Sequence, residues 1–131
     1  KHVPEIQVHG LLENRPLFVP SIGNFKQGMI VQVPLHLSAL PGAPTAVDIR
    51  KALTEHYAGR KFVTVADLNP AAGLDAESLN GANEMRLYVL ANEAEGHAVL
   101  AAVSDNLGKG AAGQAVQNLN LMLEAEESLG L

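Results

Sequence analysis

The chain has 131 residues, of which 47% are hydrophobic and 18% charged, and its formal net charge is −5. This is the composition of one globular domain with a sizeable core. The acidic net charge argues against nucleic acid as a partner. No apolar stretch is long enough to predict a membrane span. The lack of cysteine excludes disulfides, thiolate zinc sites and a thiol nucleophile, so we expect a cytoplasmic protein without a metal site.

The chain starts with KHVPEI, which has the pattern of a helix start but carries no methionine. A fragment of a longer protein is the simplest explanation. Pro4 suits the first turn of a short helix that we expect to end near Leu12, because its missing N–H would have no partner there. A short strand is predicted at 17–19, followed by turns around Gly23 and Gly28.

Alternating apolar residues in MIVQVPLHLSAL predict a long strand over 29–40 with one covered face. Pro34 cannot donate a ladder hydrogen bond, which places it at a sheet edge or a bulge. A helix is predicted from Pro44 and Thr45, with an apolar stripe that includes Val47, and it ends at Gly59.

A strand over 61–67 is followed by a loop of about 17 residues at 68–84, a length that compact domains tolerate mainly for function. Two further strands at 85–94 and 97–106 form a hairpin that turns at Glu95-Gly96. Antiparallel hairpins with helices grouped to one side indicate an α+β fold, with a mixed, largely antiparallel sheet and helices packed on one face.

The last predicted helix, at 105–124, has no charged residue from Gly110 to Leu123. At 100° per residue one side is an apolar stripe that we expect in the core. The other side carries amides, and we expect it to contact a neighbour that is missing from this chain. Exposure of that side to solvent is the simpler alternative. Small residues in the first turn, Gly110 to Gly113, favour the close approach of a neighbouring backbone or flat ligand. The predicted core stripe consists of Ala111, Ala112, Ala115, Val116, Leu119, Met122 and Leu123.

Four segments carry a resemblance to a known family. DNLGKGAAGQAVQNLNLML is similar to the C-terminal signature of the N-acetyl-γ-glutamyl-phosphate reductases, the arginine-biosynthesis branch of the semialdehyde dehydrogenases. KHVPEI resembles that family's His-Arg-His-x-Pro-Glu-Ile, with Lys1 in the place of Arg. FVPSIGNFKQGMI and LNGANEMRL resemble its Thr-Pro-His-Leu and Gly-Thr-Asn-x-Cys stretches, although Ser21 stands where the family has His. The likeness covers essentially all 131 residues.

The resemblance implies that residues 1–131 form a C-terminal catalytic and dimerisation domain like that of glyceraldehyde-3-phosphate dehydrogenase. It implies an NADP-dependent reductase that forms a thioester on a cysteine and reduces an acyl phosphate to N-acetylglutamate semialdehyde. The cysteine and the Rossmann domain would lie upstream, so the fragment alone would be inactive. The family packs its last helix against that domain beside the nicotinamide, so the amide side of 105–124 would meet the missing domain and cofactor. A homodimer or homotetramer is expected.

The resemblance also assigns site residues. His2 would be the catalytic acid/base partner of the missing cysteine, at a helix N-terminus that favours the neutral imidazole. Lys1, Glu5 and Asn83 would contact the substrate. The nicotinamide side of the cofactor would meet Asn106, Lys109 and Gln114.

Each assignment has a simpler structural alternative. Glu5 also suits a residue that complements the helix dipole, Asn83 a turn residue, and Lys109 a solvated loop. The other histidines, His9, His36, His56 and His97, show no spacing typical of a metal site. Two functional alternatives stay open: a non-enzymatic oligomerisation or ligand-binding module, and a related amino-acid semialdehyde dehydrogenase.

Overall fold

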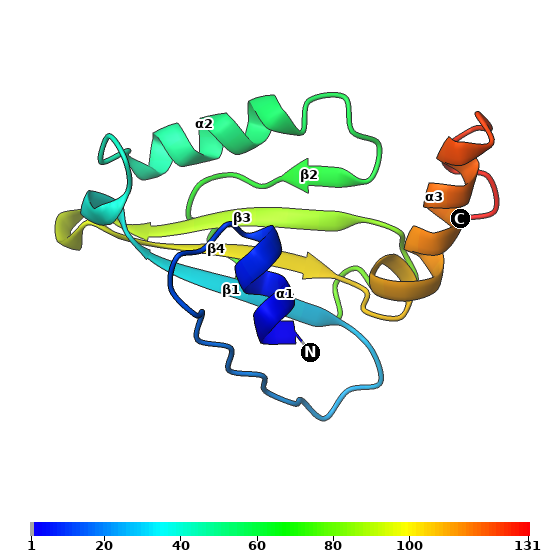
Figure 1. The fold of residues 1–131 in the computed structure, drawn as a ribbon, viewed down its shortest axis with the longest axis horizontal. Helices are drawn as coiled ribbons and strands as arrows, with labels where there is room; N and C mark the ends of the chain where they lie inside the picture. The colour runs from blue at the N-terminus through cyan, green and yellow to red at the C-terminus, as the bar shows by residue number, and fades with distance from the viewer. Residues whose placement is uncertain (1) are drawn as a thin grey trace.

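The structure is a computed structural model and describes residues 2–131. Its centre is a four-stranded sheet in the order β1-β4-β3-β2 (Figure 1). Strands β1 (Met29–His36), β4 (His97–Ser104) and β3 (Met85–Asn92) are antiparallel neighbours, and β2 (Val63–Val65) pairs in parallel with β3. The predicted α+β class with a mixed, largely antiparallel sheet is confirmed.

The hairpin of β3 and β4 forms the middle of the sheet and supplies most of its core. Val89 and Val103 are completely buried, and Ala98 and Ala101 are nearly so. A 3-10 turn, Glu93–Glu95, and Gly96 in the left-handed conformation connect the two strands, as the Glu95-Gly96 signal predicted. Local turn chemistry and strand alternation therefore agree here.

Strand β1 lies at one edge of the sheet, which confirms the prediction made for Pro34. The strand ends at His36 and continues as a 3-10 turn, Leu37–Ala39, so it is shorter than expected. The prediction that one face of this strand is covered is wrong, because Val31 and Val33 remain 47% and 49% exposed. Helix α2 packs mainly on β2 and β3, and between Leu53 and Tyr57 of α2 and the two valines there is an open hollow.

Helix α2 (Ala46–His56) begins with a reciprocal cap between Thr45 and Asp48. The Thr45 hydroxyl accepts from the Asp48 backbone N–H at 3.2 Å, and the Asp48 carboxylate accepts from the Thr45 N–H at 2.9 Å. Arg50 then ties the helix to the sheet, since its Nε donates to the Ala66 carbonyl at 2.8 Å. The helix was predicted correctly, but Val47 points away from the core and is exposed.

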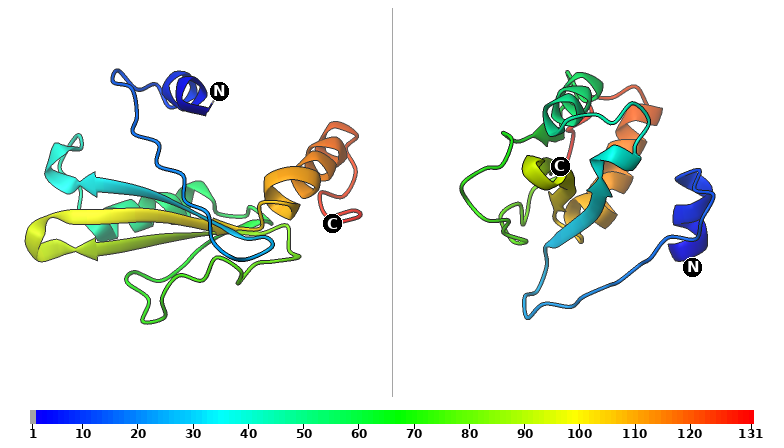
Figure 2. Two further views of the ribbon diagram at one scale, coloured as in Figure 1. Left: turned by 90° about the horizontal axis from the view of Figure 1, so that it is seen from below. Right: turned by 90° about the vertical axis from the view of Figure 1, so that its left-hand side faces the viewer.

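The predicted strand at 17–19 does not form, and Leu17 is 97% exposed. Prolines flank the segment at positions 16 and 20, and neither can donate to a ladder. Helix α1 (His2–His9) precedes this segment and buries no residue. Figure 2 shows α1 standing clear of the sheet in both views.

The last helix leaves the end of β4 as a π-helical turn, Gly108–Ala112, and continues as α3 (Gly113–Met122). The prediction that its apolar stripe lies in the core is wrong: Leu119, Met122 and Leu123 are exposed, Met122 at 81%. The chain after the helix folds back along the amide side, where Asn120 Nδ2 donates to the carbonyls of Glu127 (3.1 Å) and Leu129 (2.8 Å). Gln117 and Asn120 of the amide side are therefore internal, whereas Gln114, Asn118 and the apolar side are exposed.

Candidate functional site

The carboxylate of Asp105 organises the end of the sheet where β4 meets the last helix. Asp105 is 1% exposed and accepts four hydrogen bonds. Its Oδ2 accepts from Gln27 Nε2 and from the Gly81 N–H, both at 2.8 Å. Its Oδ1 accepts from the N–H groups of Leu107 (2.8 Å) and Gly108 (3.0 Å). One side chain thus joins three segments that are far apart in the sequence.

Hydrogen bonding lowers the pKa of Asp105 below its ordinary value. The backbone N–H of Gly81 contributes most, followed by that of Gly108, while burial opposes the shift. Hydrogen bonds to a carboxylate favour its charged form, so Asp105 is an ionised group near neutral pH. The bonds to Leu107 and Gly108 also fix the backbone where the π-helical turn begins.

Asn106 continues the same junction by fixing the start of β1. Its side-chain oxygen accepts from the Gly28 N–H at 2.8 Å, and Asn80 Nδ2 donates to the Gln27 carbonyl at 3.1 Å. Gly28 has φ +114°, and a Cβ there would lie 2.3 Å from the Ala76 carbonyl oxygen. Only glycine fits this close approach of two backbones.

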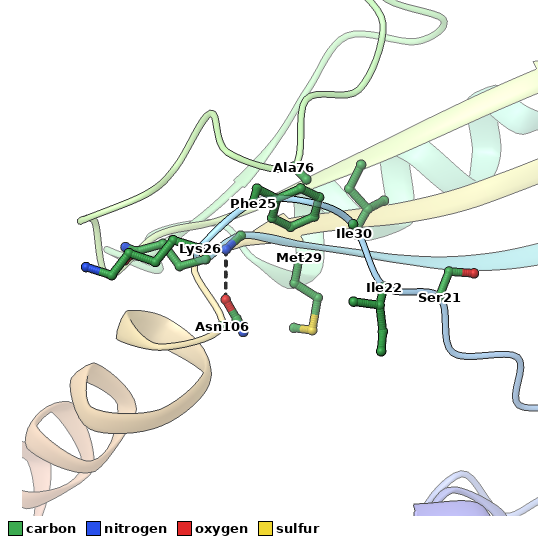
Figure 3. Close-up of a pocket in the computed structure, with 11 residues that line it drawn as sticks. Ser21, Ile22, Phe25, Lys26, Met29, Ile30, Ala76 and Asn106 are labelled. Atoms are coloured by element: carbon green, nitrogen blue, oxygen red, sulfur yellow. Dashed lines mark hydrogen bonds between the residues drawn. The ribbon is translucent and has the colours of Figure 1, made fainter.

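A cavity of about 580 Å³ adjoins the junction (Figure 3). The segment from Ser21 to Ile30 forms most of its wall, and Ala76 and Asn106 complete it. The figure shows the rings and chains of Phe25, Met29 and Ile22 around this space, with the Asn106 bond to Gly28 at one end. The cavity is therefore mainly apolar, with an amide group at its rim.

Lys109 lies in the π-helical turn that begins the last helix, and its side chain is buried rather than in a solvated loop. It is 9% exposed, and its Nζ is 5.6 Å from the centroid of the Phe62 ring. The amine also donates to Gln117 Oε1. Burial lowers the pKa of Lys109, and the nearby Glu127 carboxylate opposes that shift. The amine is thus engaged by side chains of its own chain.

Gln117 links Lys109 to both Asn83 and Glu127. Its Oε1 accepts from Asn83 Nδ2 at 3.1 Å, and its Nε2 donates to Glu127 Oε1 at 2.6 Å. Asn83 Oδ1 is buried and has no hydrogen-bond partner among the described residues. It lies against Gly113, where a Cβ would come within 2.3 Å of it. This network holds the first turn of α3 against the 68–84 loop.

The structure brings together some of the predicted site residues and leaves others apart. Asn83 and Lys109 share Gln117, and Asn106 belongs to the adjoining junction. Gln114 is exposed on the outer side of α3, and His2 and Glu5 are exposed on α1. The His2 ring lies 5.7 Å from the Phe18 ring.

Within residues 2–131, no hydrogen bond joins α1 to the Asp105 junction or to the Gln117 network. Lys1 lies outside the described residues. Asp105, Gln117 and Glu127 were not among the site residues predicted from the sequence. For Asp105 a signal existed, since Asp is a preferred residue directly before a helix. The sequence contains no such signal for Gln117 and Glu127, because their partners depend on how the end of the chain folds back.

Across residues 2–131, no group of three or more His, Asp or Glu side chains is arranged to hold a metal ion. The helices of this part of the chain are also too short or too polar to cross a bilayer.

Comparison with known proteins identifies the relatives of the chain. Residues 1–106 match the family model described as semialdehyde dehydrogenase, dimerisation domain. The chain is 55% identical over 126 residues to the N-acetyl-γ-glutamyl-phosphate reductase of Brucella anthropi and 56% identical to those of Brucella ovis and Brucella canis. These matches cover 94% of the chain but only 40–41% of the relatives' length. The chain therefore belongs to the semialdehyde dehydrogenase family, and residues 1–106 correspond to its dimerisation domain.

Proposed function

We propose that this chain acts as the C-terminal part of an NADP-dependent N-acetyl-γ-glutamyl-phosphate reductase. The observation that supports the proposal most strongly is the identity of 55% over 94% of the chain to a protein of that name. Such identity extends past the dimerisation domain to the last helix, which the family model does not cover. The substrate would be the acyl phosphate, reduced to the semialdehyde in the cytoplasm.

The nucleophile and most of the cofactor site would come from outside these 131 residues. The sequence contains no cysteine and no Gly-x-Gly-x-x-Gly stretch. When bound, the nicotinamide supplies the hydride for the reduction. The chain itself would supply proton transfer, contacts that orient substrate and cofactor, and the surface on which the remaining part of the protein packs.

His2 is proposed as the acid/base group, with Lys1 and Glu5 at the substrate. The exposed position of His2 on α1 supports this, because its imidazole is accessible to a thiol carried by another part of the protein. An imidazole can accept a thiol proton and return it later to the reduced substrate. Asn83, whose buried Oδ1 has no partner in residues 2–131, is proposed at the substrate's other end.

The start of the last helix fits the approach of a flat polar ring. Gly110, Ala111, Ala112 and Gln114 are all exposed, and none of the first three has a bulky side chain. Asn106 uses its oxygen on Gly28, which leaves its NH₂ group to face a ligand. We propose that Asn106 and Gln114 contact the cofactor, and that Lys109, buried in the π-helical turn, acts through Gln117.

The exposed apolar side of α3 is proposed as the surface that meets the nucleotide-binding domain. Leu119, Met122 and Leu123 form this side, and apolar side chains of this size are rarely left together in water. The dimerisation domain also indicates a homo-oligomer, and we propose a homodimer or homotetramer.

The experiment that tests the function is a chimera in which this chain replaces the matching part of the Brucella anthropi relative. Reduction of N-acetyl-γ-glutamyl phosphate is followed by NADPH consumption, with NADH, aspartyl phosphate and aminoadipyl phosphate as comparisons. We expect the acetylglutamyl substrate to react fastest. No turnover by a folded chimera would contradict the proposal, and preference for another acyl phosphate would assign a related dehydrogenase.

Within the active chimera, His2→Ala is expected to lower kcat by about 10²–10⁴-fold, because proton transfer by a positioned side chain contributes that much. The matched control is His9→Ala, an exposed histidine on the same helix. Near-normal turnover of the His2 variant would exclude this residue from the mechanism.

A further inference from the structure

His36 and His97 come together at the end of the sheet, although the sequence separates them widely. His36 is the last residue of β1 and His97 the first residue of β4. The register of the two antiparallel strands pairs them directly. Because directly paired residues point to the same face of a sheet, the two imidazoles lie side by side.

The hydrogen-bond pattern shows that this is the closer of the two kinds of antiparallel pair. The Leu37 N–H donates to the Gly96 carbonyl at 2.9 Å, and this bond joins the residue after His36 to the residue before His97. His36 and His97 therefore form a non-hydrogen-bonded pair, in which side chains approach most closely. Their ring centroids are 4.8 Å apart and the ring planes are nearly perpendicular, at 87°.

This separation is what two imidazoles need to share one metal ion. A metal–nitrogen bond of about 2.0–2.1 Å places each ring centroid about 3.2 Å from the ion. The two centroids would then be about 4.5 Å apart for ligands at 90° and about 5.2 Å apart for a tetrahedral angle. The observed 4.8 Å lies between these values, so the strands can stay in place. The rings meet edge to face, so the imidazoles must rotate about their side-chain bonds for a nitrogen of each to face one ion.

The surroundings leave the pair accessible. Both histidines are exposed, and the next residue across the sheet from His97 is the exposed Asn92. Glu93 and Glu95, in the turn before Gly96, add negative charge to this end of the hairpin. Imidazole nitrogen favours Cu²⁺, Zn²⁺ and Ni²⁺ over Mg²⁺ and Ca²⁺.

We propose that His36 and His97 form a two-imidazole chelate for a divalent transition-metal ion, with water in the remaining coordination positions. The site is separate from the proposed reductase function and depends on none of its residues. Its effect is mechanical: a bound ion links the edge strand β1 to the central strand β4. By mass action, an ion that binds only the folded chain also raises its stability.

The test is a titration of the metal-free, untagged chain with ZnCl₂, followed by calorimetry and by NMR of the imidazole nitrogens. We expect one Zn²⁺ per chain, shifts at His36 and His97, and a higher midpoint of thermal unfolding. His36→Gln and His97→Gln should each weaken Zn²⁺ binding by about 10-fold or more, because each removes one of two ligands. His9→Gln is the control and should change the affinity less than about 2-fold.

Circular dichroism without metal checks that each variant keeps the fold, which is expected because both side chains are exposed. If only one of the two substitutions fails to fold, the other still decides the question. Shifts confined to His2, His9 or His56, or equal affinity losses in the His9 variant, would overturn the proposal.

Discussion

At the scale of single residues, Asp105 has the largest structural role in the chain. It is a buried carboxylate whose four partners belong to the start of β1, the 68–84 loop and the turn before α3. No other side chain within the described residues accepts as many hydrogen bonds. Its ionisation should therefore affect the stability of the whole end of the sheet.

The lowered pKa of Asp105 gives a signed prediction for pH dependence. A carboxyl whose pKa is lower in the folded than in the unfolded chain stabilises the fold above its unfolded pKa. That contribution is lost as the pH falls through the folded value. In urea unfolding, Asp105→Asn should therefore lower the free energy of unfolding at pH 7, because an amide nitrogen would face donors. The gap to the unmodified chain should narrow below about pH 4.

The control for this prediction is Asp67→Asn. Asp67 pairs with Arg50 at the surface, and its side chain is 95% exposed. Its substitution should change stability within about 0.5 kcal/mol at either pH. A gap between Asp105→Asn and the unmodified chain that stays constant from pH 7 to pH 3 would contradict the stated role of the charge.

Gly113 gives a second prediction at this scale, because replacing this helical glycine by alanine should destabilise the fold, contrary to the general rule. Glycine to alanine inside a helix usually stabilises by about 1 kcal/mol. At Gly113 the added Cβ would lie 2.3 Å from Asn83 Oδ1 and 3.0 Å from the Gly108 carbonyl. We expect Gly113→Ala to destabilise by about 1–3 kcal/mol in chemical denaturation.

Gly110→Ala is the matched comparison, since its Cβ would meet nothing nearer than 3.5 Å. It should leave stability unchanged or raise it. Adding Asn83→Ala to Gly113→Ala should recover part of the loss in a double-mutant cycle. Equal effects of the two alanine substitutions would show that the Asn83 contact is not limiting.

At the scale of elements, the orientation of α3 depends on the segment that follows it. Lys61 Nζ donates to Glu126 at 2.8 Å, and Gln117 and Asn120 hold Glu127 and Leu129. These contacts come from both the β2 region and α3. Residues 124–131 are therefore held at both sides, which explains why Gln117 and Asn120 of the helix are internal.

Asn120→Ala tests this arrangement. Asn120 is buried, and its removal leaves two backbone carbonyls without a partner, at a cost of about 1–3 kcal/mol. Hydrogen exchange should speed up at 124–131 while the amides of β4 stay protected. Asn118→Ala on the exposed side of the same helix is the control, with an expected change within about 0.5 kcal/mol. Uniform loss of protection across the sheet would argue against a local role.

Most elements could be predicted from local pattern, and the failures have physical causes. The β3–β4 hairpin and α2 were found because alternation, caps and turn residues agree within one stretch. The strand predicted at 17–19 from its apolar residues does not form, because the two flanking prolines cannot donate to a ladder. The buried side of α3 could not be predicted, because an apolar stripe shows amphipathicity but not which side a distant segment will cover.

The same limit applies to the candidate sites. His2, Asn83, Asn106, Lys109 and Gln114 were identified by resemblance, and their roles stay predictions. Spacing along the chain could not reveal the Asp105 junction or the His36–His97 pair, since both depend on sheet register. What the sequence did contain was the Asp before the helix and the edge position of Pro34.

At the scale of the whole molecule, the apolar residues are distributed unevenly. The described core is small, whereas α1, the segment after it and the outer side of α3 expose many large apolar side chains. An isolated soluble domain rarely shows such surfaces together. This distribution is consistent with a chain that spans about two-fifths of its relatives' length.

A paired measurement tests the proposed role of the α3 surface. In the 131-residue chain, Leu119→Ser with Met122→Ser should change the unfolding midpoint little and improve solubility, because both side chains are already exposed. In the chimera with the nucleotide-binding part, the same changes should lower the midpoint of thermal unfolding, since each would remove a buried contact worth about 1–3 kcal/mol. An equal response in both contexts would contradict an interface on this side.

The edge position of Pro34 has a consequence for how copies of the chain can associate. Pro34 pairs with Val99 two residues from the close histidine pair, so its nitrogen faces outward from the sheet. A strand that docked from solvent would find no donor at that point, although the half-exposed Val31 and Val33 before it offer an apolar edge. Addition of a further strand at the β1 edge, the step by which a sheet grows into a fibril, is thereby hindered.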